Sequence, residues 1–258
     1  MIQSEDVFAN ELEVFRTEAE SGIQFFYSYL TVHAVAGENK DVHRLLNQAP
    51  LFWNTALGAL QTSAFIALGR VFDQKSKHNI DLLLKIAQSN IFIFSKEALS
   101  GRKRRGSTNA DQWIDEYLRE VYVPNADDFR RLRRHVAKRR KIYEDKYRTL
   151  RHQVFAHKTI SAKEDEQALF DKTNVREFQQ LLIFLRRLHE ALWQLYNNGR
   201  KPTLLPTRYS VKRIREQPSP ELRGRALQER LVHEIEAFLK TVANKAQQLP
   251  QPALLSFD

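Results

Sequence analysis

The feature that most constrains this chain is the spacing of its apolar residues, which recur every three or four positions through most of its 258 residues. From residue 4 to about residue 37, this spacing places apolar side chains on one face of a long helix. All eight prolines fall where the pattern breaks, so none interrupts a helical repeat. Glycine, with eight residues, is too scarce for a turn-rich β fold. We therefore expect an all-α protein built as an antiparallel bundle of long helices.

The same reasoning places the remaining elements. Further helices are expected at 41–47, 51–73, 80–89, 111–121, 125–157 and 173–199. The basic run between Gly101 and Gly106 is expected to be a loop. We predict a helical domain over 1–199, a basic linker over 200–217, and a C-terminal extension with one extra helix over 218–258.

The chain contains no cysteine, which excludes disulfides, thiolate metal sites and a cysteine nucleophile and fits a reducing compartment. The N-terminus carries acids where an export signal has a basic region. Residues 45–69 hold no charge, as a membrane span would require, but they include several amides and hydroxyls. We interpret this stretch as a helix buried inside a soluble, cytoplasmic protein, without a membrane partner.

The net charge of +10 is unevenly distributed. Residues 125–157 alone carry +7, the run 102–105 adds +4, and the segment 200–217 adds +5. Concentrated positive charge attracts a phosphate backbone, because binding releases condensed counterions. A solvated helix face is an equally good explanation of the composition, so RNA binding and ordinary surface charge both stay open.

The common catalytic motifs are absent, including a phosphate-binding glycine loop, a nucleophile elbow and a zinc-protease helix. The candidate catalytic residues lie at the end of the basic helix, where His157 continues the apolar stripe seven residues after Leu150. A histidine there is placed for proton transfer at neutral pH. Arg151 lies about 120° away on an ideal helix, so the two converge only if the helix bends or across a dimer. By spacing alone, a buried histidine and a snorkelling arginine explain the pattern better.

The run Arg151-His152 followed by His157 matches the Arg-x(4–6)-His signature of the HEPN superfamily. Upstream, the apolar stretch 51–73 ends in the pattern Arg-x-Phe-Asp at residues 70–73. The helix expected after Asn79 comes next in the sequence. This combination resembles the abortive-infection U-type branch of the superfamily over residues 5–199. Arg70 and Asp73 match the branch pattern as well, and their spacing suggests a structural ion pair at a helix end.

The resemblance implies a helical homodimer in which two Arg…His motifs form a composite site. It implies a metal-independent endoribonuclease that needs no cofactor and acts in phage defence or as a toxin. In that chemistry the ribose 2′-oxygen attacks the adjacent phosphate, with His157 as general acid/base, Arg151 stabilising the developing charge and His152 assisting. The basic residues expected to bind RNA are Arg133, Arg134, Lys138, Arg140, Lys141, Arg148 and Lys158.

A second hypothesis is a non-catalytic module that binds RNA, a nucleotide or a protein within a defence or toxin–antitoxin system, because fold does not imply function. An antitoxin or second defence component would then be a partner. A third hypothesis is an interaction scaffold whose apolar seams and C-terminal helix bury against another protein.

Overall fold

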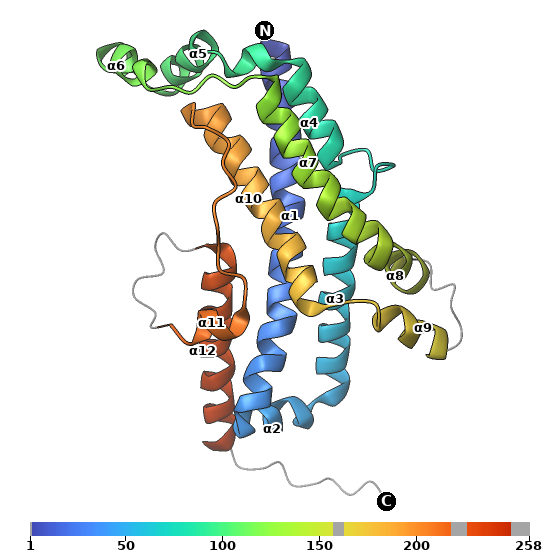
Figure 1. Cartoon of the computed structure of the whole chain (residues 1–258). Helices are drawn as coiled ribbons and strands as arrows, with labels where there is room; N and C mark the ends of the chain where they lie inside the picture. Colours follow the sequence, from blue (N-terminus) through green and yellow to red (C-terminus); the bar gives the residue numbers. More distant parts are fainter. Residues whose placement is uncertain (1, 157–162, 218–225, 249–258) are drawn as a thin grey trace, which may run out of the picture. The chain divides into compact units, whose positions relative to one another are not determined.

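A computed structural model describes residues 2–156, 163–217 and 226–248, and these residues form helices and no strand (Figure 1). The prediction of an all-α helical bundle is confirmed. The chain folds into two compact units, the first made of residues 1–22 and 65–207 and the second of residues 23–64 and 208–258. The units do not follow sequence order, since α12 packs against α2 in the second unit. The predicted division at residues 199 and 217 stays a prediction.

Two long helices, α1 (Ile2–Glu38) and α3 (Pro50–Phe72), contribute residues to both units. The other helices of the first unit are α4 (Ile80–Ser89), η1 (Ile91–Phe94), α5 (Lys96–Gly106), η2 (Ala110–Gln112), α6 (Ile114–Arg119), α7 (Ala126–Ile142), η3 (Tyr143–Tyr147), α8 (Arg148–Leu150), η4 (Arg151–Ala156), α9 (Lys163–Phe170) and α10 (Val175–Asn198). The second unit adds α2 (Lys40–Gln48), α11 (Val211–Arg215) and α12 (Leu227–Gln248). Of the short elements, η1 and η2 are 3₁₀-helices, and η3 and η4 are π-helical.

Aromatic side chains form the core of the first unit at one end of α7. The rings of Phe8 and Phe94 meet edge to face with centroids 5.2 Å apart, and Phe94 lies 5.6 Å from Phe129. Tyr196 of α10 closes the group at 5.1 Å from Phe8. Each ring pair stabilises the fold by more than the burial of its apolar surface alone would. These contacts join α1, α7 and α10 into one packed body.

A second aromatic cluster lies where the extension of α7 meets α3 and α10. Phe65 is central, with ring centroids 4.7 Å from Phe178 and 4.6 Å from Phe155. The hydroxyl of Tyr147 donates to the carbonyl oxygen of Asn174 at 3.0 Å, just before α10 begins. This cluster fixes the position of the chain that carries Arg151.

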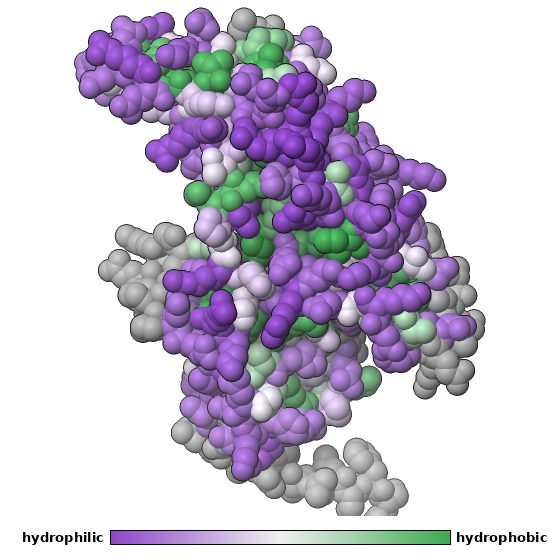
Figure 2. Space-filling model, viewed as in Figure 1, coloured by the Kyte–Doolittle hydropathy of each residue, from purple (hydrophilic) through white to green (hydrophobic). Residues whose placement is uncertain are grey.

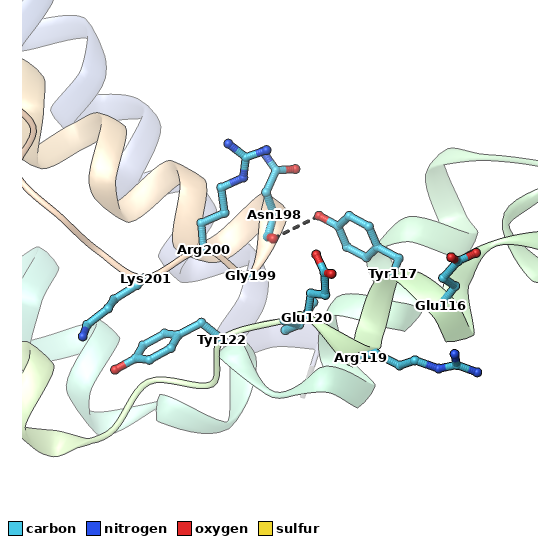
Figure 3. Close-up of a pocket in the computed structure, with 10 residues that line it drawn as sticks. Glu116, Tyr117, Arg119, Glu120, Tyr122, Asn198, Gly199, Arg200 and Lys201 are labelled. Atoms are coloured by element: carbon cyan, nitrogen blue, oxygen red, sulfur yellow. Dashed lines mark hydrogen bonds between the residues drawn. The ribbon is translucent and has the colours of Figure 1, made fainter.

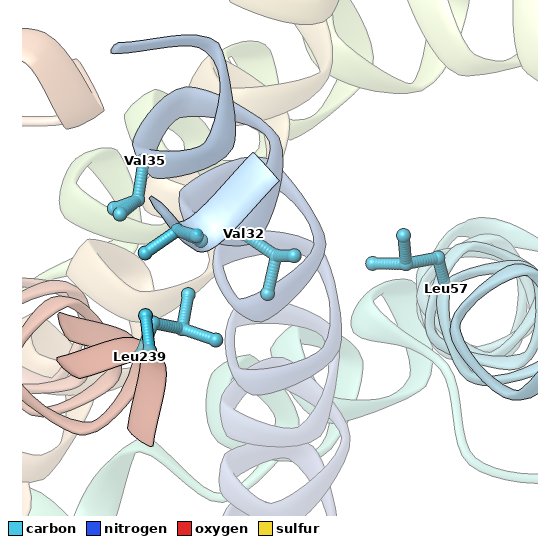
Figure 4. Close-up of a cluster of buried hydrophobic side chains, with 6 residues drawn as sticks. Val32, Val35, Leu57 and Leu239 are labelled. Carbon is cyan, nitrogen blue, oxygen red and sulfur yellow. The ribbon is translucent and has the colours of Figure 1, made fainter. Parts of the chain in front are cut away.

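The core of the second unit is aliphatic (Figure 4). Val32 of α1 points toward Leu57 of α3, and Leu239 approaches α1 from α12. Val35 and Val42, both fully buried, and Ala243 of α12 complete the cluster. Burying such side chains contributes about 2 kcal/mol each. The second unit is therefore held together by segments from the two ends of the chain.

Local sequence explains most helix boundaries. The side chains of Asn79 and Asn125 accept hydrogen bonds from the backbone at the starts of α4 and α7. Asn125 forms a full capping box with Asp128. The start of α10 was predicted at Thr173, but its cap is Asn174. Gly199 ends α10 in a left-handed conformation with φ of 57°.

The prediction of a loop over residues 101–106 is wrong. The run 101–106 is helical and forms the second half of α5. The reason lies far along the sequence, because Arg102 donates to Glu5 and to the carbonyl oxygen of Tyr196, each at 2.8 Å. The segment 200–217 contains the short helix α11, in which Val211 and Ile214 are buried.

Helix α3 differs from the prediction of a helix buried on all sides. Phe65 and Leu68 are buried, but near its start Leu51 is 82% exposed and Phe52 is 63% exposed. Among the described residues, α3 is the one helix long and apolar enough to cross a membrane. This is weak evidence for a span, since core helices of soluble proteins share these properties.

Candidate functional site

The candidate site lies in the first unit, where the C-terminal end of α3 meets η4. The Nη2 atom of Arg151 donates to Oδ2 of Asp73 at 3.1 Å and lies 2.9 Å from Nε2 of His152. The same imidazole nitrogen is 3.7 Å from Oδ2 of Asp73. Asp73 thus holds the arginine, and the arginine contacts its neighbouring histidine, so two of the three predicted catalytic residues lie together.

Burial divides the roles of these three side chains. The side chains of Arg151 and Asp73 are 12% and 11% exposed, whereas that of His152 is 37% exposed. An arginine–carboxylate contact away from bulk water is stronger than one at the surface. Asp73 therefore fixes the arginine, and the imidazole is the member of the group most open to a ligand.

Gly69 of α3 provides the space in which Arg151 lies. A methyl group at this position would overlap Cδ and Nη1 of the arginine and lie 2.8 Å from its Nε. The guanidinium therefore rests directly against the helix backbone, one turn before Asp73. Glycine is required here for close approach rather than for an unusual backbone angle.

Two buried polar atoms beside this group have no hydrogen-bond partner within the described part of the chain. They are Nε of Arg151 and the hydroxyl of Tyr143. Burial raises the pKa of Tyr143 to about 12, with smaller and opposing contributions from Arg151 and Asp73. Its phenol is therefore neutral at physiological pH. Unsatisfied buried groups are costly, so each one in a native structure calls for an explanation.

The backbone here is unusual. The long helix that begins with α7 turns π-helical at η3 and, after one turn of α8, again at η4. Such segments are rare and occur frequently at functional sites. The predicted helix to residue 157 is thus continuous through Ala156 but irregular, and η4 begins at Arg151 itself. His157 and Lys158 lie outside the described residues.

Asp73 is the site residue that sequence reasoning missed. It was interpreted as an ion-pair partner of Arg70, but Arg70 bonds Glu18 of α1 at 3.2 Å and is exposed. Asp73 instead faces Arg151, which is 78 positions away in the sequence. The Arg-x-Phe-Asp pattern was the available signal, although the spacing of its two charged residues suggested a different pair.

A basic face follows α7 toward the site. Arg133, Arg134, Lys138 and Lys141 are exposed and form no ion pair with any residue that the structure describes. Figure 2 shows hydrophilic residues over the visible face of this helix. Burial and then the neighbouring cations, Arg139 first, lower the pKa of His135. The charge of α7 is therefore locally concentrated and available to an anion.

The remaining cations predicted to bind RNA are arranged differently. Arg140 pairs with Asp81 of α4, and its side chain is 14% exposed. Arg148 is half-buried on α8. Elsewhere on α7, Arg130 and Arg131 pair with aspartates of the first helical turn. The RNA-binding assignment stays a prediction, with its best support at the four unpaired positions.

No cluster of three or more potential metal ligands occurs among residues 2–156, 163–217 and 226–248. The expectation of metal-independent chemistry stays a prediction. The arginine and the histidine gathered at Asp73 are groups that stabilise charge and transfer protons.

Comparison with known proteins gives one family. The model of the HEPN family described as AbiU2 matches residues 5–214, which include both α3 and the Arg151 region. No curated protein and no solved structure matches the chain. The match spans most of the sequence and agrees with the resemblance carried by Arg151, His152 and the end of α3. The chain therefore belongs to the AbiU2 family of HEPN proteins, a family associated with abortive infection.

Proposed function

We propose that this protein is a metal-independent endoribonuclease that acts in phage defence or as a toxin. The observation that carries the proposal is the convergence of Arg151, His152 and Asp73 at the end of the basic helix. An arginine stabilises the charge of a pentavalent phosphorane, and a histidine transfers protons near neutral pH.

The reaction requires one proton to move and one bond to be exchanged. His157 accepts the proton of the ribose 2′-hydroxyl, and the 2′-oxygen forms a bond to phosphorus. The bond from phosphorus to the 5′-oxygen breaks, and the leaving oxygen takes up the proton that the histidine collected. The products are a 2′,3′-cyclic phosphate and a 5′-hydroxyl. Arg151 stabilises the added negative charge, His152 assists, and Asp73 orients the arginine.

The exposed cations of α7 would bind the phosphates of the RNA on either side of the cleaved bond. A track of unpaired arginine and lysine side chains binds RNA without reading its sequence, and its affinity falls as salt rises. The four positions on α7 support this role because no described carboxylate neutralises them.

The test is cleavage of a labelled single-stranded RNA in the presence of EDTA. We expect wild-type protein to release fragments with cyclic-phosphate and 5′-hydroxyl ends, and His157→Ala to release none. His152→Ala should cleave more slowly, because it removes an assisting group. Unchanged cleavage by His157→Ala would overturn the assignment of the general acid/base.

A second candidate is a non-catalytic RNA-binding module, and one observation favours it. Arg151 is largely buried against Gly69 and paired with Asp73, as in a structural ion pair. This function predicts tight, salt-dependent RNA binding without product. Measurement of binding and cleavage on the same RNA at about 50 mM salt separates the two candidates.

We propose further that the protein acts in the cytoplasm as a homodimer, with an antitoxin or second defence component as a further partner. Exposed Leu51 and Phe52 offer apolar surface for self-association. Light scattering should give the mass of two chains, and Phe52→Ser should weaken the dimer. A strict monomer would contradict a composite site.

A further inference from the structure

A second site is indicated in the first unit, away from Arg151, by a hollow of about 690 Å³ between the end of α6 and the end of α10 (Figure 3). Residues 116, 117 and 119–122 form one wall, and residues 198–201 form the other. Its volume falls within the range of small-molecule sites. The hollow lies at the N-terminal end of α7, and the Arg151 group follows its C-terminal end.

The walls are held in place by backbone contacts. Gly199 accepts a hydrogen bond from the backbone N–H of Tyr122 at 2.7 Å, and the hydroxyl of Tyr117 donates to the carbonyl oxygen of Asn198 at 3.0 Å. A methyl group on Gly199 would come within 2.6 Å of Val121. The hollow is thus formed before any ligand binds, which lowers the entropic cost of binding.

Two tyrosines of the hollow carry lysines beside their rings. Nζ of Lys201 lies 5.7 Å from the ring centroid of Tyr122, and Nζ of Lys103 lies 5.3 Å from that of Tyr117. Burial raises the pKa of Tyr117, so its phenol is neutral at physiological pH. Aromatic rings with adjacent cations are the combination that stacks bases and binds the phosphates of single-stranded nucleic acid.

The charges around the hollow have opposite signs yet do not pair. Glu120, Arg200 and Lys201 are exposed, and none forms an ion pair with another described residue. In Figure 3, Glu120 lies between Tyr117 and Tyr122, facing the wall that carries Arg200. A ligand that fits must present hydrogen-bond donors to a carboxylate and an anion to the cations.

We propose that this hollow binds a nucleotide whose base presents amino and ring N–H donors, with guanosine monophosphate units as the best fit. Guanine offers two adjacent donors that one carboxylate accepts together, whereas uracil has no amino group. Glu120 reads the base edge, Tyr117 and Tyr122 contact its faces, and Arg200 and Lys201 bind the phosphate. The ligand is either a unit of the RNA strand or a free nucleotide.

The inference rests on the proposed function only in taking RNA as the source of the nucleotide. In the RNA-strand form, a guanosine held here would have the basic face of α7 between it and the Arg151 group. Helix α7 has 17 residues and is therefore about 25 Å long. The hollow would then anchor one part of a strand while another part is cleaved.

The test is a calorimetric titration of the full-length protein with GMP, UMP and a guanosine-containing oligonucleotide in 2′-deoxy form. The deoxy strand lacks the attacking hydroxyl, so binding is measured without cleavage. We expect GMP to bind about tenfold more tightly than UMP. Tighter binding of the oligonucleotide than of GMP identifies a strand as the ligand, and equal binding identifies the free nucleotide.

Substitutions test whether Glu120 and Lys201 are responsible for nucleotide binding. Glu120→Gln should remove the preference for GMP while leaving UMP binding unchanged, and Lys201→Glu should weaken both about tenfold. Lys245→Glu, an equal charge reversal at an exposed lysine of α12, should change neither. Thermal unfolding of each variant should match wild type, since all three side chains are exposed.

Failure of this proposal is distinguishable from failure of the proposed function. No binding of GMP at millimolar concentration, or a GMP preference that survives Glu120→Gln, overturns the nucleotide site even if RNA is cleaved. Binding of GMP that depends on Glu120 supports the nucleotide site even if no RNA is cleaved.

Discussion

Two largely buried arginines, one in each unit, show the difference between an ion pair that supports the fold and one that leaves capacity for chemistry. Arg215 in the second unit is 11% exposed and Arg151 in the first is 12% exposed. Arg215 bonds Glu236 through Nε and Nη2, both at 3.0 Å, and Glu38 through Nη1 at 2.9 Å. Every nitrogen of its guanidinium has a carboxylate partner.

Within the described part of the chain, one nitrogen holds Arg151. Its Nη2 contacts Asp73 and His152, while its buried Nε has no partner within the described residues. A fully bonded arginine has nothing left to give a ligand, whereas a partly bonded one retains donors at a fixed position. The two arginines are therefore similarly buried but differently bonded, and Arg151 is the one of the two with a donor left for a ligand.

The largest expected effect is on cleavage, and it tests this comparison directly. Arg151→Ala should lower the cleavage rate by about 100-fold to 1,000-fold, the usual cost of removing a group that stabilises transition-state charge. The matched change Arg215→Ala should leave the rate of the folded protein near that of wild type. Single-turnover rates at a temperature where both variants are folded provide the measurement. Equal losses of cleavage rate in the two variants would contradict the distinction between a catalytic and a structural arginine.

Acid should affect the two units through different groups. Burial and, secondarily, Arg186 lower the pKa of His189 on α10 to about 4, from 6.5. The unfolded chain then binds a proton that the folded chain refuses, so stability falls as pH drops from about 6.5 to about 4, by up to about 3 kcal/mol. His189→Gln should flatten this part of the curve in chemical denaturation. A curve unchanged by His189→Gln would show that other groups govern it.

The second unit should respond at lower pH. Burial opposes ionisation of Glu236, but Arg215 and Lys240 hold its pKa below the usual value. A lowered carboxylate pKa contributes stability above the ordinary value, and this is lost as pH falls through the lowered one. Glu236→Gln should therefore destabilise at neutral pH and have less effect in strong acid. Denaturation curves at several pH values test the sign.

A smaller effect on stability is expected from breaking the ion pairs that Arg215 forms in the second unit. Arg215→Gln should lower the free energy of unfolding by about 2 kcal/mol, less than for a fully buried pair, because Glu38 is exposed. Urea denaturation gives the value. A loss within about 0.5 kcal/mol of zero would mean that the pair does not stabilise the second unit.

The sequence predicted what depends on near neighbours. The helices starting after Asn79 and Asn125 and the end of α10 at Gly199 follow from capping and spacing within one turn. The basic run 101–106 was expected to be a loop, because its helix depends on contacts of Arg102 with residues more than ninety positions away. Local patterns do not encode such contacts.

The candidate site was predictable in part for the same reason. Arg151 and His152 were found by their motif, because the family signature is short and continuous. The roles of Asp73 and Gly69 depend on the packing of α3 against η4, which no spacing rule supplies. The π-helical start at Arg151 was not predicted, since helical periodicity assumes an α-helix throughout.

The most direct test of the central claim compares two glycines of the same helix. Gly69→Ala forces a methyl group into the space of Arg151, while Gly58→Ala adds one where, apart from its own stretch of helix, no described atom lies within 4 Å. Both variants keep every proposed catalytic side chain, and each exchange favours the helix by up to about 1 kcal/mol. We expect Gly69→Ala to cleave RNA in EDTA about a hundredfold more slowly than wild type, and Gly58→Ala to cleave at the wild-type rate. Wild-type cleavage by a folded Gly69→Ala protein would contradict the claim that the position of Arg151 is catalytic.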